Sequence, residues 1–172
     1  SVTAELPASE PPTSKAGGSA PLLNHRYRIV RSLAEGSFGK TYLAEDTQMP
    51  SGRRCVIKQL KPISGNPAVE KVVQQRFLRE VAVLDAVGKT HPQIPTLYAY
   101  FSQAGQFYLV QEWIDGEPVW SMPQSVWTEE KVLALLKSLL PVLSHLHRQN
   151  IIHRDIKPGN ILITRADSLP YL

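Results

Sequence analysis

The residues whose types and spacing most clearly suit a chemical reaction lie in the stretch IIHRDIKPGN, residues 151–160. A carboxylate, Asp155, an ammonium, Lys157, and an amide, Asn160, follow one another closely there. A proline and a glycine in the same stretch disfavour a regular helix, so we expect a loop held at both ends by apolar residues. These groups suit the attack of an alcohol on a phosphoryl group beside a metal ion. Asp155 would orient the hydroxyl and accept its proton, Lys157 would neutralise charge on the transferred group, and Asn160 would bind Mg²⁺.

Strands must position such a loop, and five segments have the alternation or the β-branched and aromatic content of strands. The turn-forming stretches TQMPSGR and QAG each separate two of them, as in antiparallel hairpins. Together they predict a sheet of about five strands. In chain order the segments are YRIVRSL, KTYLAED, RCVIKQL, TLYAYFS and QFYLVQEW.

A helix is predicted between the third and fourth strands, over residues 67–87. Apolar residues recur there at intervals of three or four, which is typical of an amphipathic helix. Glu80 lies on the apolar stripe, where a carboxylate is costly unless a cation or several donors meet it. A lysine partner for Glu80 is therefore expected. The stripe consists of Val69, Val73, Phe77, Val81 and Leu84.

A second helix is predicted to begin at Thr128, whose hydroxyl would cap it. Glu129 and Glu130 would favour the positive end of the helix dipole. Pro141 should kink the helix or loosen one turn. The predicted buried face consists of Val132, Leu135, Leu136, Leu139, Leu143 and Leu146.

The composition is that of an ordinary globular protein. In 172 residues, 19 Lys and Arg against 15 Asp and Glu give a net charge of +4, which is too small and too dispersed to indicate a nucleic-acid partner. A single cysteine, Cys55, excludes an internal disulfide and a CxxC zinc site, which favours a reducing, cytoplasmic location. No apolar run approaches the ~20 residues that span a bilayer, and no signal peptide is visible.

The loop that opened this section resembles the catalytic loop of the protein kinase family, HRDxKPxN, in its serine/threonine form. The lysine two residues after Asp155 marks that form. The resemblance implies ATP and Mg²⁺ as cofactors and a protein Ser or Thr hydroxyl as acceptor. It also assigns Arg154 to contact with a phosphorylated activation loop.

Upstream, LAEGSFGKTY resembles the family's glycine-rich loop, whose backbone N–H groups cover the nucleotide phosphates. It departs from GxGxxGxV at Ala34, which replaces the first glycine, and at Thr41, which replaces the valine. A pair of glycines between strands also suits a plain hairpin. The nucleotide contacts that the resemblance implies here are Leu33, Gly36, Ser37, Phe38, Gly39 and Thr41.

The segment CVIK resembles the family's VAIK strand, with Val56 against the nucleotide and Lys58 on its phosphates. The family pairs this lysine with a glutamate of the next helix, and Glu80 is the residue in that place.

In LVQEWIDGEP the resemblance implies an adenine-binding connection. Backbone groups of Glu112 and Ile114 would bind the base, Gln111 would be the gatekeeper, and Glu117 would lie near the ribose. An ordinary strand end followed by a turn explains the same residues.

The 172 residues contain no Asp-Phe-Gly motif, whose aspartate is the family's other Mg²⁺ ligand, and no Ala-Pro-Glu segment. The resemblance runs from about residue 25 to the end and corresponds to the front portion of a kinase domain, truncated before that motif. Two expectations follow. Phosphoryl transfer by this chain alone should be very weak, and the helix from Thr128 should expose leucines that aggregate or bind a partner.

We therefore predict an α+β fold: a flexible segment 1–24, a kinase N-lobe 25–115 with five strands and one helix, and a partial C-lobe 116–172. The predicted activity is that of a bacterial serine/threonine protein kinase. Two alternatives stay open. One is a noncatalytic ATP-binding or protein-interaction module, and the other is a kinase of small alcohols or aminoglycosides.

Two further groups receive a structural interpretation. His145, His147 and His153 lack a fourth ligand and are interpreted as structural histidines rather than a metal cluster. Cys55 is interpreted as a small strand residue, although its closeness to Lys58 could lower the pKa of its thiol.

Overall fold

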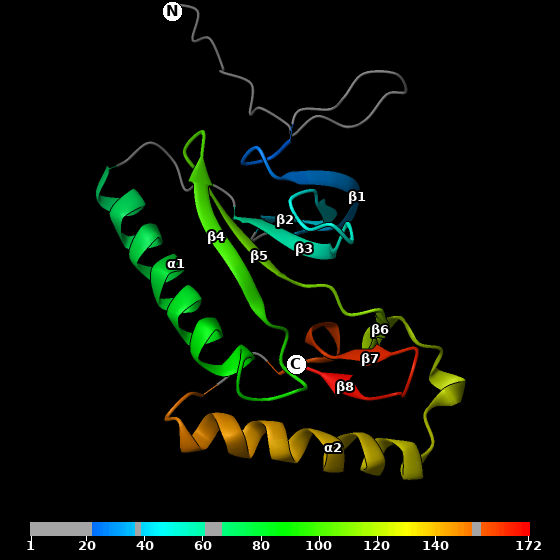
Figure 1. The fold of residues 1–172 in the computed structure, drawn as a ribbon. Helices are drawn as coiled ribbons and strands as arrows, with labels where there is room; N and C mark the ends of the chain where they lie inside the picture. The colour runs from blue at the N-terminus through cyan, green and yellow to red at the C-terminus, as the bar shows by residue number, and fades with distance from the viewer. Residues whose placement is uncertain (1–21, 37–38, 61–66, 153–155) are drawn as a thin grey trace, which may run out of the picture.

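The computed structural model describes residues 22–36, 39–60, 67–152 and 156–172 (Figure 1). Its first half is a five-stranded antiparallel sheet with strand order β1-β2-β3-β5-β4, crossed by one long helix, α1. This confirms the predicted α+β arrangement of five strands and a helix. The bounds are β1 Tyr27–Gly36, β2 Gly39–Asp46, β3 Arg54–Leu60, α1 Pro67–Gly88, β4 Leu97–Gln103 and β5 Gln106–Glu112.

The register of the sheet decides which side chains share a face. Lys58 on β3 pairs with Thr41 on β2 and with Leu109 on β5, and Val56 pairs with Gln111. Paired residues of antiparallel strands lie on the same face, and alternate residues of one strand share it too. These five residues therefore lie on one face of the sheet. It is the face that α1 covers, because Leu109 belongs to the cluster that packs on that helix.

The opposite face holds the larger apolar core. Ile57 and Val110 are completely buried there and pair with each other across β3 and β5. The rings of Tyr27 and Tyr108 each stack on the ring of Phe101, with centroids 6.0 and 5.1 Å away. The described members of this core come from the five strands and from Leu23, just before them. Its buried members are Tyr27, Ala44, Cys55, Ile57, Tyr108 and Val110.

Helix α1 covers the Lys58 face, as its apolar stripe predicts. Phe77 and Val81 are buried against Leu97 and Leu109, and Phe77 stacks on the ring of Phe107 with centroids 4.9 Å apart. Phe77, Val81 and the half-buried Leu84 bear out the predicted stripe. The side chains of Val69 and Val73 lie outside the described part.

A buried carboxylate fixes the start of β1 against the turn between β2 and β3. Asp46 is 1% exposed and accepts two 2.8 Å hydrogen bonds from Arg26 and a longer one, 3.3 Å, from Arg53. These bonds, from Arg26 above all, hold the pKa of Asp46 below its ordinary value. The guanidinium of Arg53 also lies over the ring of Tyr98, 3.8 Å from its centroid. Charge pairing therefore holds the start of β1 against the ends of β2 and β3.

The second half of the chain combines a small sheet with one long helix. The sheet has strand order β6-β7-β8, and the end of α2 lies near the end of α1 (Figure 1). Single turns of 3₁₀ helix, η1 to η3, connect these elements. The bounds are β6 Gly116–Pro118, η1 Val119–Ser121, η2 Gln124–Val126, α2 Glu129–Arg148, η3 Pro158–Asn160, β7 Leu162–Thr164 and β8 Pro170–Tyr171.

Helix α2 begins where the sequence predicts. The hydroxyl of Thr128 accepts a 3.3 Å hydrogen bond from the N–H of Lys131, and Glu129 and Glu130 occupy the first turn. The helix continues through Pro141, and the expected kink or loosened turn there stays a prediction. Pro141 is exposed, so the carbonyl that lacks an N–H partner can reach water.

The predicted buried face of α2 is wrong in part. Leu139 and Leu146 are buried, but Val132 and Leu136 are 40% and 52% exposed. Val142, which the sequence pattern missed, is completely buried. The reason is that the described residues contact α2 along one narrow stripe, so part of its apolar surface stays exposed.

That stripe joins the two halves. Val142 and Leu146 pack on Val87, at the end of α1, and on Ile94, in the connection to β4. In the same connection the side-chain amide of Gln93 donates to the carbonyls of Ser138 and Pro170, at 3.1 and 2.8 Å. The end of α1 is thus attached to α2 by both apolar and polar contacts.

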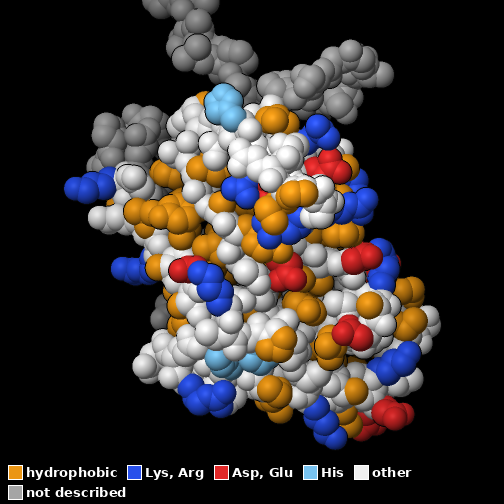
Figure 2. All heavy atoms as spheres, viewed as in Figure 1, with side chains coloured by type: hydrophobic (Ala, Val, Ile, Leu, Met, Phe, Trp, Pro, Cys, Tyr) orange, Lys and Arg blue, Asp and Glu red, His pale blue; other side chains and the backbone are white. Residues whose placement is uncertain are grey.

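Two surface properties bear on partners. No helix among the described residues is long and apolar enough to cross a membrane. On the face shown in Figure 2, lysine and arginine side chains are interspersed with aspartate and glutamate, and no large area carries a single sign. This face therefore lacks the continuous basic surface that nucleic-acid binding uses.

Candidate functional site

Four of the predicted site residues of the sheet share one face. Thr41, Val56, Lys58 and Gln111 all lie on the side that α1 covers. Lys58 is exposed, whereas Val56 is buried. Glu80 belongs to α1, one turn after the buried Phe77, so its backbone lies on the helix that covers Lys58. The side chain of Glu80 lies outside the described part, and its pairing with Lys58 stays a prediction.

The glycine-rich segment closes the β1–β2 hairpin. Gly36 pairs with Gly39, and the residues between them, Ser37 and Phe38, lie outside the described part. Gly39 has φ of +148°, and a Cβ there would lie 1.9 Å from the carbonyl oxygen of Gln59 on β3. Only glycine fits, so strand packing alone demands it, whatever the hairpin binds.

One predicted contact, Leu33, and one departure from the family pattern, Ala34, lie on β1 just before Gly36. Leu33 is 36% exposed, and a register shift between Ser32 and Ala34 interrupts the pairing with β2 beside it. Ala34, which replaces the family's first glycine, pairs with Thr41 as an ordinary strand residue.

The connection from β5 to β6 includes a residue, Ile114, whose backbone N–H has no hydrogen-bond partner among the described residues. The N–H of Glu112 donates to the carbonyl of Thr96 at 2.8 Å, and the Glu112 carboxylate accepts from the N–H of Thr96 at 3.1 Å. Ile114 is 8% exposed. Among the described residues no hydrogen bond joins the backbone of Ile114 to another group. A backbone N–H requires a hydrogen-bond partner, so the donor at Ile114 fits a ligand that offers an acceptor.

The same connection is attached to the turn that carries Asn160. The N–H of Val119 donates to the carbonyl of Ile161 at 2.9 Å, and strand β6 pairs with β7. Within the turn η3, the N–H of Asn160 donates to the carbonyl of Lys157, also at 2.9 Å. Asn160 is half-buried and Lys157 is exposed. Strand pairing therefore places the Lys157–Asn160 turn next to the β5–β6 connection, although the turn comes about 40 residues later in the sequence.

Arg165 strengthens this attachment, and the sequence pattern did not identify it. Its N–H donates to the carbonyl of Asp115 at 3.0 Å, and its guanidinium pairs with the carboxylates of Asp115 and Glu117 at 2.8 and 3.2 Å. The hydrogen bond to Glu117 raises the pKa of Arg165. No local signal could reveal pairs that lie 48 and 50 positions apart. Glu117, predicted to lie near a ribose, is thus ion-paired in this structure.

Several predicted residues cannot be placed. His153, Arg154 and Asp155 lie outside the described residues, so the predicted general base has no described geometry.

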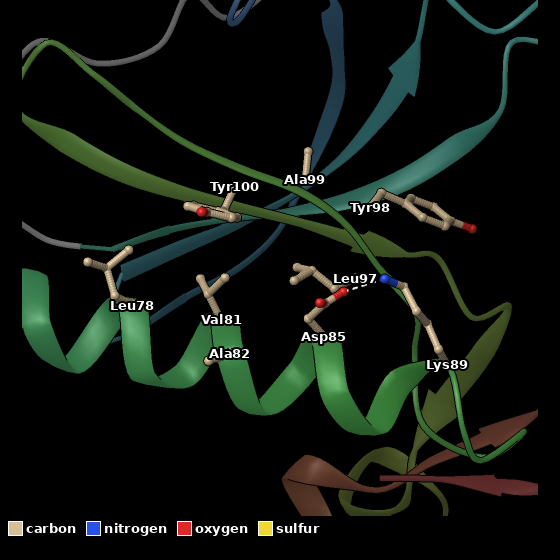
Figure 3. Close-up of a pocket in the computed structure, with 9 residues that line it drawn as sticks. All are labelled: Leu78, Val81, Ala82, Asp85, Lys89, Leu97, Tyr98, Ala99 and Tyr100. Atoms are coloured by element: carbon tan, nitrogen blue, oxygen red, sulfur yellow. Dashed lines mark hydrogen bonds and ion pairs between the residues drawn. The ribbon is translucent and has the colours of Figure 1, made fainter.

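One pocket lies away from the predicted site residues (Figure 3). It has a volume of about 490 Å³ and lies between α1 and β4, lined among others by Leu78, Val81, Leu97 and Tyr100. The ion pair between Lys89 and Asp85, at 2.5 Å, lies at one end. None of the predicted site residues lines this pocket. A second pocket, of about 550 Å³, includes Glu112 and His91.

His145 and Cys55 have identifiable surroundings in the structure. His145 lies against His91, with ring centroids 5.1 Å apart, and its Nε2 lies 2.8 Å from the Thr90 hydroxyl. No group of three or more metal-binding acids, histidines or cysteines occurs among the described residues. The suggestion that Lys58 lowers the pKa of Cys55 is wrong: the thiol is fully buried on the opposite face, and burial raises its pKa to about 11.

Comparisons with known proteins agree with this arrangement. The protein kinase domain family model matches residues 27–169. The chain is 52% identical over 153 residues to "Serine/threonine-protein kinase PknA" of Nostoc sp. and 51% identical over 153 residues to "Serine/threonine-protein kinase C" of Synechocystis sp.. Each match covers 88% of this chain but only 27% and 29% of those proteins. A third relative, the "Probable serine/threonine-protein kinase YbdM" of Bacillus subtilis, is 36% identical over 147 residues, which are 83% of this chain and 54% of that protein.

Proposed function

The chain belongs to the protein kinase family, and from that premise we propose that it is the ATP-binding portion of a bacterial serine/threonine protein kinase. The reaction would transfer the γ-phosphoryl group of Mg-ATP to a Ser or Thr hydroxyl of a protein. The observation that carries the proposal is the attachment of the Lys157–Asn160 turn to the strand connection that leaves the Lys58 sheet. Residues that the kinase reaction needs on both sides of a nucleotide are thereby joined through β5, β6 and β7.

The donor set fits an adenine nucleotide. The unpartnered N–H of Ile114 suits a ring nitrogen of the base, and the buried Val56 suits its apolar face. Lys58 lies on the same sheet face as Val56 and would hold the phosphates by charge. Asn160 offers one amide oxygen to Mg²⁺, which would neutralise charge on the phosphates when bound. The residues described here thus fit ATP more fully than they fit the metal.

In the reaction, the chain's own groups would act by position. Asp155 would accept the hydrogen bond of the acceptor hydroxyl and take its proton, and Lys157 would hold the transferred group by charge. Because the 172 residues contain no Asp-Phe-Gly motif, Mg²⁺ would lack a carboxylate ligand within this chain. Loss of one positioned acid-base or metal group costs about 10² or more in rate, so we expect only weak transfer.

Phosphate transfer from γ-labelled ATP to protein and to small-molecule acceptors tests this proposal. We expect slow labelling of Ser and Thr in protein acceptors, none with Asp155→Asn, and none of aminoglycosides. A chimera continued with the matching remainder of the Nostoc relative should transfer faster. Strong activity of the short chain would contradict the expected weakness, and labelling of small acceptors alone would contradict the protein-kinase proposal.

A noncatalytic role is the second candidate, and one observation favours it. Leu133, Leu136 and Leu140 on α2 are 47%, 52% and 61% exposed, which suits a protein partner that covers this helix. Nucleotide binding without turnover, in both the short chain and the chimera, would favour this role. A cytoplasmic location also stays a prediction.

A further inference from the structure

Two histidines meet where the two halves of the chain are joined, at the ends of α1 and α2 (Figure 1). His91 lies in the connection from α1 to β4, and His145 belongs to the last turn of α2. Their rings lie against each other, with centroids 5.1 Å apart, and both side chains are half-buried. Leu146, next to His145 in the chain, packs on Val87 at the same junction. A charge on either ring would therefore lie where the two halves touch.

The hydrogen bond of His91 suits an uncharged ring. The backbone N–H of Gln93 donates to Nδ1 of His91 at 3.2 Å, so the neutral ring carries its proton on Nε2. A second proton, taken from water, would enter at Nδ1 and end this bond. Gln93 is also the residue whose side-chain amide donates to the carbonyls of Ser138 on α2 and Pro170 on β8. The uncharged ring thus helps to hold the residue that ties the α1–β4 connection to both elements.

His145 is held by a similar set of bonds. Its Nε2 lies 2.9 Å from the side-chain amide nitrogen of Gln149 and 2.8 Å from the hydroxyl of Thr90. An amide nitrogen only donates, so Nε2 accepts and the ring carries its proton on Nδ1. The Thr90 hydroxyl also donates to the carbonyl of Val87, at 3.0 Å. A proton added at Nε2 would face the amide of Gln149 and disturb a set of bonds that links α2 to the end of α1.

The acidic groups of the surrounding elements do not stabilise a positive charge on these rings. Among the described residues no hydrogen bond or ion pair joins either ring to a carboxylate. Asp85 pairs with Lys89, and Glu112 accepts from the N–H of Thr96. The titratable groups on the adjoining elements are Asp85 and Lys89 at the end of α1, Glu112 on β5, His147 and Arg148 on α2, and Tyr171 on β8.

The electrostatic surroundings of His91 also favour its neutral form. Burial above all, and then the charges of His145 and Arg148, lower the pKa of His91 below its ordinary value of about 6.5. Two charged rings at this separation would repel each other, so each proton that is bound opposes the next.

We propose that His91 and His145 form a pH-sensitive joint between the end of α1 and the end of α2, closed while both rings are uncharged and loosened when they take up protons. The joint needs no nucleotide, and the proposal does not rest on the kinase function. The folded pKa of His91 lies below its unfolded value, so its contribution is complete above about pH 6.5 and is lost as the pH falls toward the folded pKa. This window lies above the range in which Asp46 titrates.

Proton NMR of the histidine rings between about pH 8 and about pH 5 tests the electrostatic part of the proposal. The chain has five histidines, and the signals lost in His91→Asn and in His145→Gln identify the two rings. The wild-type His91 signal should titrate below about pH 6.5, and its pKa should rise in His145→Gln, where the facing charge is gone. His147→Gln changes an exposed residue of the same helix and should leave the His91 titration unchanged.

Amide hydrogen exchange tests whether the joint itself responds. The N–H groups of Thr90 and Ile94 donate to the carbonyls of Val87 and His91 at the junction. Their protection, corrected for the intrinsic exchange rate, should fall several-fold between about pH 7.5 and about pH 5.5 in the wild-type chain. It should stay nearly constant in His91→Asn. An asparagine oxygen accepts from the N–H two residues later, as in an Asx-turn, so this variant keeps the bond to Gln93 without titrating.

Three results would overturn the joint. These are a His91 ring that titrates at or above its ordinary value, a His91 pKa that does not rise in His145→Gln, and the same pH dependence of exchange in the wild-type chain and in His91→Asn. If His145→Gln does not fold, the exchange comparison with His91→Asn decides the matter by itself.

Discussion

The two faces of the β1–β5 sheet and the surface of α2 differ in how completely their apolar residues are covered. Ile57 and Val110 in the sheet are completely buried, while Leu136 and Leu140 on α2 are 52% and 61% exposed. The sheet obtains its cover from its own strands and from α1, whereas α2 touches the rest of the molecule along the stripe around Val142. The difference teaches that packing within the sheet and against α1 is enough to fix β3, the strand of Lys58. The leucine face of α2, in contrast, needs contacts that the described residues do not supply.

The largest expected effect is on the stability of the sheet. Ile57→Ala should lower the free energy of unfolding by about 2–5 kcal/mol, since it leaves a cavity in a closed core. Leu140→Ala removes the same kind of side chain from an exposed position and should change it by less than about 0.5 kcal/mol. Urea unfolding followed by circular dichroism measures both. Equal losses would show that α2 is as well packed as the sheet.

The buried thiol gives the next largest effect. With its pKa raised to about 11, Cys55 should react with a disulfide reagent at pH 8 at least ~100-fold more slowly in the folded chain than in urea. The rate should rise in Ile57→Ala, which loosens the surrounding core. A fast reaction of the folded wild-type chain would mean that the Cys55 side of the sheet opens readily.

The ion pairs of Asp46 with Arg26 and Arg53 should make the next contribution to the stability of the sheet. Asp46→Asn should cost about 1–3 kcal/mol, because Arg26 and Arg53 lose their charged acceptor while both remain about a third exposed. The folded pKa of Asp46 lies below its unfolded value, so its contribution is complete above about pH 4 and is lost as the pH falls through the lower, folded pKa.

Measuring the free energy of unfolding as a function of pH compares the wild-type chain with Asp46→Asn. The wild-type chain should lose its advantage over Asp46→Asn in that acidic range. A constant difference from neutral to strongly acidic pH would contradict the assigned charge pairing.

The smallest effect on stability, and the clearest on association, concerns α2. Leu136→Glu with Leu140→Glu should reduce binding of an apolar dye several-fold and reduce self-association, with little change in the free energy of unfolding. Val30→Glu is a matched control on β1, where the replaced side chain is also exposed, at 47%. Light scattering and dye fluorescence report both properties. Equal reductions in the control would argue against a distinct sticky surface on α2.

The sequence predicts the sheet well because its signals are local. Alternation defines each strand, the spacing of Phe77 and Val81 defines α1, and Thr128 marks the start of α2. Strand β6 and the ion pairs of Arg165 were not predicted, since they depend on pairing with residues far along the chain. The cover of α2 also escaped prediction, because an apolar stripe shows what a helix can bury and not what is present to bury it.

The candidate site shows the same division. The motifs locate Lys58 and Asn160 by type and order, and the register then shows that Thr41, Val56 and Gln111 share the face of Lys58. Gly39 is a motif residue that packing explains without any ligand. Its positive φ and its closeness to Gln59 would require glycine even if no nucleotide were bound. A motif residue can therefore be demanded by packing and by binding at once, and only a binding measurement separates the two.

The most direct test of the central claim is a titration of the chain with a fluorescent ATP analogue in Mg²⁺, comparing Lys58→Met with Lys89→Met. Lys89 is 61% exposed and lies at the far end of α1, paired with Asp85. The wild-type chain and Lys89→Met should bind alike, and Lys58→Met should bind at least about tenfold more weakly, because a phosphate loses its charged partner. Absence of binding, or equal binding by all three proteins, would contradict a nucleotide site on the Lys58 face of the sheet.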